Sequence, residues 1–407
     1  MTKIKPFKAI RPTRDKAYLV PTRPFYTYKK KILKAKIASN PFTFLHVINP
    51  EFSKDNVSVP NSDERFKSVK AKFDEFLAEG IFIQEKEDSF YIYRQTTERH
   101  IYTGIIAGAS VKSYQENKIK KHEATLTERE ETFTKYLSIV TFNAEPVLLF
   151  HENHAKLKSI YAEEVQKRAE YEFSTTQRIK HELWIVDDPE RIQEIQDCFK
   201  EIDELYIADG HHRSASSSRF YNEHGDSSQN ADYFLSYLIS EENVTIFDYN
   251  RLVKDLNGLS ETEFIAKLST SFDVDSNVTQ ISSENPHQIC MYLNQNWHKL
   301  TIKSELIDEK DPVKSLDTYI LNELLLEPIL GIKDIKTDSR ISFVEGTKGS
   351  RGITRKVNSG EFAVGFLLHP VSVDQLKKVA DTNQIMPPKS TWIEPKLRSG
   401  LTIYPLK

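Results

Sequence analysis

Apolar residues recur along the chain with two different spacings that alternate. In Asp63–Glu79 they return every three or four positions, which predicts a helix, and Gly80 follows as its C-cap. Shorter runs rich in aromatic and aliphatic residues predict strands. Helices are expected at Tyr26–Ser39, Asp63–Glu79, Val111–Tyr136, His154–Phe173, Pro189–Ile202, His211–His224, Glu261–Leu268, Ser315–Leu326 and Val373–Asp381. Strands are expected at Phe42–Pro50, Ser89–Thr96, His100–Ser110, Pro146–Phe150, Leu183–Asp188, Glu204–Asp209, Asp232–Ile239 and Ile246–Val253.

This alternation of helices and strands, without an internal repeat, predicts a mixed α/β (α+β) fold. A chain of 407 residues is long enough for two or three structural units. We expect an N-terminal α+β segment at 1–150, a core at 151–275 and a C-terminal α+β segment at 276–407. The polar stretch Ser276–Pro286 provides the best break between the last two.

Composition narrows the function classes. The net charge of −3 shows no basic excess, so nucleic acid is not an expected partner. The two cysteines, Cys198 and Cys290, exclude a disulfide framework and a four-cysteine zinc site. Only 13 glycines are present, which excludes collagen-like and glycine-rich low-complexity chains. No signal sequence or membrane-length apolar run is visible, so a soluble cytoplasmic protein without a membrane partner is expected.

The sharpest motif is ADGHHR at 208–213, between a predicted strand and a predicted helix. Gly210 carries no side chain that would keep a ligand away from the backbone. The first N–H groups of a helix have no internal partners, and together with the helix dipole they form an anion site. Arg213 adds a planar guanidinium suited to phosphate oxygens.

The neighbouring side chains add further chemistry. Asp209 is a candidate ligand for a metal ion, or a partner that orients a histidine. His211 and His212 can donate or move a proton near neutral pH. Ser214 begins a run of hydroxyl side chains in the same turns. The alternative is an ordinary helix N-terminus with polar capping, but two adjacent histidines are rarely both core residues, since neighbours on a helix point about 100° apart.

A histidine and a carboxylate also stand side by side at His122 and Glu123, where Glu123 is suited to accept a proton from a substrate hydroxyl. The HExxH zinc motif is not present, because Leu126 occupies the position of its second histidine. The alternative is a solvated helical face.

A second cluster near the C-terminus combines cations with hydroxyl groups that suit phosphate or carboxylate oxygens. Its members are Lys389, Ser390, Thr391, Lys396 and Arg398. The alternative is a basic surface.

Three other features are interpreted as structural. The glycine-rich stretch at 345–352 is expected to be a mobile surface turn, because it lacks the GKS/T ending of a phosphate loop. Lys29–Lys31 is expected to be a solvated helix face. His181 and Trp184 are expected to pack in the core.

The strand–DGHHR–helix unit resembles the signature of the ParB/sulfiredoxin-like superfamily, and more closely that of uncharacterised bacterial proteins and free serine kinases. The resemblance covers nearly the whole chain, in order. It includes PFKAIRP (6–12), NPFTFLHVINPE (40–51), KKHEATLTERE (120–130), HELWIVDDP (181–189), LYIADGHHR (205–213), IFDYNRLVKDLNGLS (246–260) and MPPKSTWIEPKLRSGL (386–401).

Two departures limit what the resemblance implies. Sulfiredoxins have cysteine where His211 stands, so their sulfur-phosphoryl chemistry is not implied. Much of the family has a PPYDV-like segment where this chain reads RPFYT at 23–27, and because the aspartate is absent the resemblance does not carry over the family's metal or substrate role to this segment.

The resemblance implies a ParB-like α/β core and phosphoryl transfer between free serine and O-phosphoserine, either as a kinase or as a phosphatase. ADP, ATP or pyrophosphate is the expected co-substrate and Mg²⁺ an expected cofactor. The resemblance also implies a glutamate as general base, and we assign that role to Glu123, which does not stand at a matched position of the family. The helix N-terminus and Arg213 would hold the transferring group. Lys389 and Arg398 would hold a carboxylate or a distal phosphate.

Two alternatives remain open from the sequence. One is a nucleotide-binding regulatory or DNA-associated module, the role of ParB itself, although no helix-turn-helix signal is present. The other is a metal-dependent hydrolase that uses the same histidines and aspartate.

Overall fold

The computed structural model describes residues 2–52, 57–276, 278, 283 and 285–407. Contacts divide the chain into two compact units, unit 1 (Met1–Val244 with Pro395–Lys407) and unit 2 (Thr245–Glu394). The boundaries expected from the sequence do not coincide with these units. The one after 150 falls inside strand β8 (Val147–His151), and the one after 275 falls inside β15 (Phe272–Ser276). Both strands are paired within their sheets.

Unit 1 is built on a nine-stranded mixed sheet with the order β6-β11-β8-β12-β5-β4-β10-β9, to which β1 adds by pairing with β5. Its strands are β1 (Ile4–Lys5), β4 (Phe90–Thr96), β5 (Ile101–Ser110), β6 (Ile119–Lys120), β8, β9 (Tyr171–Ser174), β10 (Lys180–Val186), β11 (Leu205–Asp209) and β12 (Tyr233–Ser240). Each strand expected between residues 89 and 239 is present. The mixed α/β class is therefore confirmed, and the sheet draws strands from both sides of residue 150.

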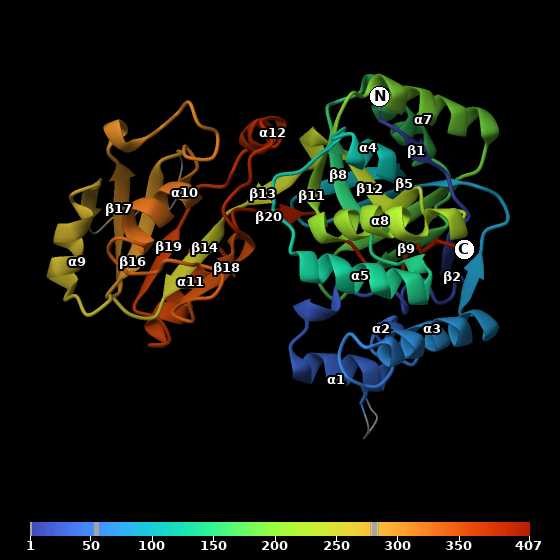
Figure 1. Ribbon diagram of the computed structural model, residues 1–407, viewed down its shortest axis with the longest axis horizontal. Helices are drawn as coiled ribbons and strands as arrows, with labels where there is room; N and C mark the ends of the chain where they lie inside the picture. Colours follow the sequence, from blue (N-terminus) through green and yellow to red (C-terminus); the bar gives the residue numbers. More distant parts are fainter. Residues whose placement is uncertain (1, 53–56, 277, 279–282, 284) are drawn as a thin grey trace. The chain divides into compact units, whose positions relative to one another are not determined.

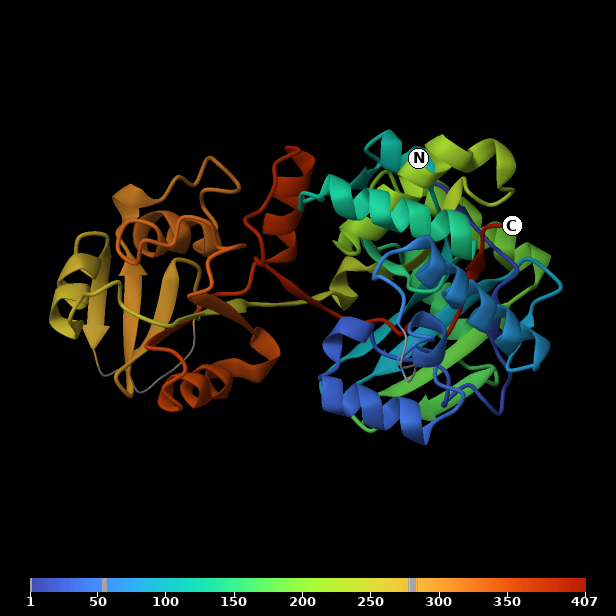
Figure 2. The ribbon, with the colours of Figure 1, turned by 60° about the horizontal axis from the view of Figure 1, so that its bottom comes forward.

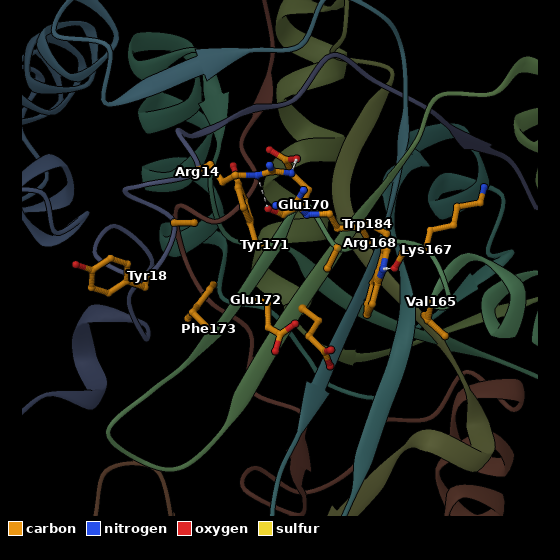
Figure 3. Close-up of a pocket in the computed structure, with 13 residues that line it drawn as sticks. Arg14, Tyr18, Val165, Lys167, Arg168, Glu170, Tyr171, Glu172, Phe173 and Trp184 are labelled. Atoms are coloured by element: carbon orange, nitrogen blue, oxygen red, sulfur yellow. Dashed lines mark hydrogen bonds and ion pairs between the residues drawn. The ribbon is translucent and has the colours of Figure 1, made fainter.

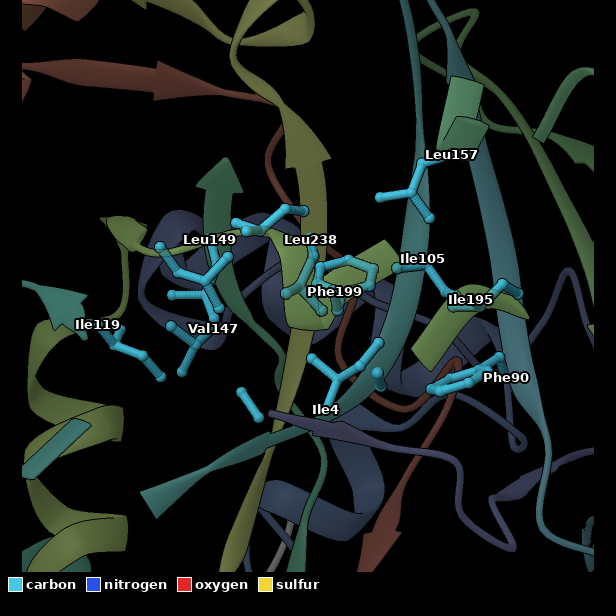
Figure 4. Close-up of a cluster of buried hydrophobic side chains, with 14 of the residues drawn as sticks. Ile4, Phe90, Ile105, Ile119, Val147, Leu149, Leu157, Ile195, Phe199 and Leu238 are labelled. Atoms are coloured by element: carbon cyan, nitrogen blue, oxygen red, sulfur yellow. The ribbon is translucent and has the colours of Figure 1, made fainter. Parts of the chain in front are cut away.

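The two faces of this sheet differ in chemistry because side chains alternate along each strand. One face packs its aliphatic side chains against α6 (Ala155–Glu164) and α7 (Pro189–Glu201), as Figure 4 shows for Ile105, Leu149 and Phe199. The other face carries hydroxyl and polar groups, including Tyr91, Tyr93, Gln95, Tyr237 and His181. His181 and Trp184 are both buried, as expected.

The other helices of unit 1 are α1 (Lys30–Ser39), α2 (Leu45–Ile48), α3 (Asp63–Ala78), α4 (Val111–Gln115), α5 (Thr127–Val140) and α8 (His211–His224). In both views α1, α2 and α3, coloured blue, lie together (Figures 1 and 2). A small core of aromatic and aliphatic side chains joins α2, α3 and α5. Lys29–Lys31 is exposed, as expected. None of the described helices is long and apolar enough to cross a membrane.

Several expectations for unit 1 are wrong in detail. Phe42–Pro50 is not a strand. It contains α2, because Phe44, Leu45 and Val47 are spaced to bury one side of a helical turn. The helix expected at Val111–Tyr136 is broken, since Asn117 adopts φ 57° and Ile119 joins the sheet beside β11.

Two further helices are shorter than expected. The helix at His154 ends at Glu164, because Tyr171 begins the edge strand β9. The helix at Tyr26 begins only at Lys30, after a 3-10 turn at Phe25–Thr27.

Unit 2 has a six-stranded antiparallel sheet with the order β15-β17-β16-β19-β14-β18. Its strands are β14 (Tyr249–Val253), β15, β16 (Gln288–Leu293), β17 (Asn296–Ile302), β18 (Ile341–Glu345) and β19 (Val364–Leu367). Its helices are α9 (Glu261–Leu268), α10 (Asp317–Leu321) with a π-helical turn at Asn322–Leu326, α11 (Gly349–Asn358) and α12 (Val373–Asp381). Cores form on both faces, one with α9 and α10 and the other with α11.

The sequence predicted a mobile surface turn at 345–352, but the stretch has regular structure. It holds a 3-10 turn and then the start of α11. Gly352 is buried in this helix, and it packs so closely that a Cβ atom there would come 2.9 Å from a side-chain carbon of Val344. The break expected at Ser276–Pro286 lies largely outside the described residues.

Short ladders complete both units. They are β2 (Ile10–Pro12) with β3 (Phe82–Gln84), β7 (Phe142–Asn143) with β21 (Tyr404–Pro405), and β13 (Thr245–Phe247) with β20 (Trp392–Glu394). The last pair joins the two ends of unit 2 in the chain.

Gly104 of β5 tests the packing of the central sheet. A Cβ atom there would lie 2.3 Å from the carbonyl oxygen of Leu238 and 2.4 Å from Ile239 Cγ2. Because backbone cannot yield cheaply, Gly104→Ala is expected to lower the free energy of unfolding by about 1–3 kcal/mol. Urea unfolding followed by circular dichroism measures this. Gly225→Ala, at φ −55° and 3.1 Å from the exposed Tyr221 ring, should cost less, and an equal or smaller loss for Gly104→Ala would contradict the packing argument.

Candidate functional site

The DGHHR motif forms the turn between β11 and α8, as the sequence predicted. Gly210 is the N-cap of α8 with φ 111°, a left-handed conformation that favours glycine. A Cβ atom there would lie 2.8 Å from Arg213 Nη2. No side chain caps the helix at this position. The positive end of the helix dipole is therefore available to an anion.

Charged groups from four chain segments meet beside this turn. Lys396 Nζ lies 3.3 Å from Asp209 Oδ2, and Arg213 Nη2 lies 3.9 Å from the same oxygen. Arg213 also forms an ion pair with Glu145, which accepts a hydrogen bond from Ser399 Oγ at 3.4 Å. Cations and carboxylates thus alternate in a network in which a phosphate would compete with Asp209 for the two cations.

The carboxyl of Asp209 stays ionised in this network. Desolvation alone would raise its pKa, but the charges of Lys396 and Arg213 outweigh that effect and hold the pKa below its usual value. The side chain keeps 38% of its surface exposed, so a ligand can reach it.

A second group of side chains surrounds His211, which is only 5% exposed. The backbone N–H of His122 donates to His211 Nε2 at 3.4 Å, so the neutral ring carries its proton on Nδ1. That Nδ1 lies 3.5 Å from Glu123 Oε2. Glu123 is 42% exposed and can meet both His211 and a substrate.

Both buried imidazoles of this group are neutral at pH 7. Desolvation lowers the pKa of His211 to about 3. The negative charge of Asp209 opposes this shift, and nearby positive charges such as that of Arg213 reinforce it. Desolvation likewise lowers the pKa of His122 to about 3, and the two rings meet edge to face with centroids 4.5 Å apart. His211 can therefore donate a hydrogen bond at neutral pH, but it does not act there as an imidazolium acid.

Residues 214–218 of α8 are buried. The hydroxyl of Ser214 donates to the carbonyl of Gly210 at 3.2 Å, within its own helix. Its neighbours Ser216 and Ser217 are buried where α8 packs against α5 (Figure 1). His212 is half-buried, and desolvation lowers its pKa. Small side chains here let the two helices approach closely.

The C-terminal cluster expected from the sequence is divided between the two units. Lys396 and Arg398 belong to unit 1, whereas Lys389, Ser390 and Thr391 belong to unit 2. Ser390 is buried and shares a hydrogen bond of 2.9 Å with Thr318, while the Lys389 ammonium lies 5.2 Å from the centre of the Tyr249 ring. These contacts give Lys389 and Ser390 structural roles inside unit 2.

Among the described residues, no three His, Cys, Asp or Glu side chains gather as metal ligands do. Asp209 faces two cations rather than further carboxylates. Its own neighbours therefore do not complete a metal site, and any Mg²⁺ there would depend on substrate oxygens for most of its ligands.

Glu145 was not expected from the sequence, whereas Ser399 stands next to Arg398 in the C-terminal cluster. Glu145 precedes β8 and is far from DGHHR in sequence. A lone Glu-Pro pair before a strand carries no signal of its own, and only the tertiary structure brings it to Arg213.

A surface hollow of about 510 Å³ lies elsewhere in unit 1, along β9 and the neighbouring part of β10. Figure 3 shows side chains of both charges lining it, including Arg14, Glu170, Tyr171 and Trp184. Arg14 Nη2 forms an ion pair with Glu170 at 2.7 Å, so these charges already satisfy one another. The hollow contains no residue of the DGHHR motif.

The chain belongs to the DUF1015 family of proteins of unknown function, whose model matches residues 4–319. No match was found among curated proteins.

Several solved structures show distant similarity. A mutant free serine kinase in complex with AMP is 14% identical, with a TM-score of 0.39 over 74% of this chain and 92% of that one. SbnI with a C-terminal truncation, from Staphylococcus aureus, is 13% identical, with a TM-score of 0.40 over 74% of this chain and 87% of that one. A conserved hypothetical protein from Pyrococcus furiosus is 14% identical, with a TM-score of 0.35 over 70% of this chain and 93% of that one. These similarities are too distant to assign a function.

The buried neutral His211 predicts a pH dependence of stability. Its pKa of about 3 in the folded state lies below the value near 6.5 of an unfolded chain, so its contribution is complete above pH 6.5 and declines as the pH falls toward 3. The wild type should lose unfolding free energy when the pH falls from 7 to 4.5. In His211→Gln this drop should be smaller by roughly 1–3 kcal/mol.

Urea unfolding at the two pH values measures the difference. The exposed His100 provides the matched control, and His100→Gln should keep the wild-type dependence. An unchanged dependence in His211→Gln would show that His211 is not held neutral by burial.

Proposed function

We propose that this protein is a phosphoryl-transfer enzyme that acts between free serine and O-phosphoserine. The observation that carries the proposal is the Gly210 turn, where an uncapped helix N-terminus lies next to Arg213 while His211 of the same turn faces Glu123. Phosphoryl transfer requires mainly positioning and charge neutralisation. The turn offers an anion site and a nearby proton acceptor, which are the two parts that such a reaction needs.

In the kinase direction, the serine hydroxyl oxygen attacks the phosphorus atom, and the bond from phosphorus to the leaving oxygen of the donor breaks. Glu123 accepts the hydroxyl proton. Its carboxylate is partly exposed, so a substrate hydroxyl can reach it, as a general base requires. In the phosphatase direction the same carboxylate takes the proton from an attacking water.

His211 acts in this proposal by positioning Glu123. Its Nδ1–H faces Glu123 Oε2 at 3.5 Å, while its Nε2 is held by the backbone of His122. A neutral imidazole can fix the direction of the carboxylate without adding a positive charge that would weaken it as a base. His122 in turn provides the dry surroundings that keep His211 neutral.

The cations on the other side would bind the transferring group. Lys396 and Arg213 lie next to the helix N-terminus, and Asp209 holds both in place in the absence of substrate. ADP, ATP or pyrophosphate is the proposed co-substrate. Asp209 is the residue that would hold Mg²⁺ together with substrate oxygens, and the ion would supply further charge neutralisation.

The carboxylate of Glu123 provides the direct test. Glu123→Gln keeps the size of the side chain beside His211 but removes the base, so the rate of serine phosphorylation should fall by about 10²–10⁴-fold. Purified protein is assayed with serine and ATP, ADP or pyrophosphate, and with O-phosphoserine. Glu128→Gln, at an exposed glutamate in the first turn of α5, is the matched control.

Two outcomes would contradict the proposal. One is that Asp209→Asn and Arg213→Ala both leave the activity intact, which would place the chemistry elsewhere. The other is that labelled duplex DNA binds at physiological salt while no phosphate compound does, which would favour a DNA-associated module.

A further inference from the structure

Two arginines stand opposite each other where the C-terminal segment returns to unit 1. Thr22 and Ser399 form an antiparallel bridge, with N–H to oxygen distances of 3.1 Å and 2.8 Å in the two directions. In antiparallel pairing the next residues along the two strands also face each other. Arg23 and Arg398 therefore lie side by side across the two strands, on the face opposite to Thr22 and Ser399.

Within the described part of the chain, no carboxylate balances these two charges. Among the described residues, neither guanidinium forms an ion pair, although Arg398 is only 9% exposed. Arg23 lies over the ring of Tyr28, 4.9 Å from its centre. The groups that influence Arg398 are Tyr93, Tyr28 and Arg23, and its pKa is lowered by burial, with Arg23 adding to that effect.

This arrangement is costly for the free protein. Like charges directly opposite each other in a β pair are destabilising, and a buried charge needs a partner. Other partly buried arginines of unit 1 have one, since Arg94 contacts Glu182 through two nitrogens at 2.8 Å and 2.9 Å, and Arg213 contacts Glu145. The exception at Arg23 and Arg398 is therefore explained if a ligand supplies the negative charge.

The surrounding sequence is strongly positive as well. Residues 16–50 contain seven Lys and Arg residues and no Asp or Glu. The lysines of α1 are exposed, and Lys36 Nζ lies 5.9 Å from the centre of the same Tyr28 ring that contacts Arg23. A surface of one sign raises the local concentration and the association rate of an oppositely charged ligand.

We propose that Arg23 and Arg398 form a binding site for the phosphate group of a small molecule. Two guanidinium groups balance the two negative charges of a phosphate monoester. A ligand with a single carboxylate would neutralise only one of the two arginines. Each guanidinium can also bind two phosphate oxygens at once. The lysines of α1 would steer the anion toward the site.

The same chain segment connects this site with the Gly210 turn. Lys396 contacts Asp209 and Ser399 contacts Glu145, and Arg398 lies between them in sequence. Binding of phosphate at Arg398 would therefore hold the segment that carries Lys396. The binding itself does not depend on the proposed reaction and is measured without turnover.

Calorimetric titration with inorganic phosphate and pyrophosphate tests the proposal. Arg23→Gln and Arg398→Gln should each weaken binding by about 10- to 100-fold, the contribution of hydrogen bonds to a charged group. Arg99→Gln removes the same charge from an exposed position of unit 1 and should bind as the wild type does. Arg398→Lys keeps the charge without the planar fork and should recover part of the affinity.

Thermal unfolding separates a binding role from a packing role. Because each Gln variant removes one of two repelling charges, its melting temperature at low ionic strength should equal or exceed that of the wild type, while stabilisation by phosphate is lost. Glu123→Gln should still bind phosphate. The binding test therefore remains valid even if the protein does not catalyse the proposed reaction.

Three results would overturn the proposal. The first is wild-type phosphate affinity in both Gln variants. The second is the loss of all phosphate binding in Arg213→Gln with none lost in Arg23→Gln or Arg398→Gln, which would place the anion only at the Gly210 turn. The third is stabilisation by acetate or serine but not by phosphate.

Discussion

The return of Pro395–Lys407 to unit 1 is the constraint on which both proposed anion sites depend. Two backbone hydrogen bonds between Thr22 and Ser399 fix this segment, and β21 pairs with β7 further along it. Once the backbone is fixed, Lys396 reaches Asp209 and Arg398 faces Arg23. The segment has little regular structure of its own, so its position comes from these pairings rather than from local preference.

Burial has opposite consequences on the two sides of the Gly210 turn. Around Asp209, the field of two cations outweighs desolvation, and the carboxyl stays charged. Around His211, desolvation dominates, and the imidazole stays neutral. The turn therefore places a charged network and an uncharged hydrogen-bond donor within a few residues of each other. That contrast is suited to a reaction in which one group neutralises phosphate charge and another fixes a base.

The sequence predicted those parts of the structure that depend on local chemistry. The β11–Gly210–α8 unit was predicted because a strand, a glycine and a helix follow one another without interruption. Glu145 was not predicted, because its contact with Arg213 joins distant segments. The C-terminal cluster was predicted as one group, but the chain passes from unit 2 to unit 1 between Thr391 and Lys396. Phe42–Pro50 has a strand-like composition, and tertiary packing of its aromatic residues makes it a helix.

Arg213 and Arg398 show how the surroundings of an arginine decide what it can do. Arg213 is paired with Glu145. A phosphate at the Gly210 turn must therefore compete with this carboxylate for Arg213, and this competition weakens phosphate binding. Among the described residues Arg398 forms no ion pair, and a second arginine, tyrosines and His181 lie near it, so an anion there would not have to displace a carboxylate partner. Tight binding is therefore favoured at Arg23 and Arg398, and a more easily exchanged anion at Gly210. Weaker binding at the Gly210 turn suits a site that must release the transferred phosphoryl group. Tighter binding at Arg23 and Arg398 would keep the other phosphate group of the ligand bound.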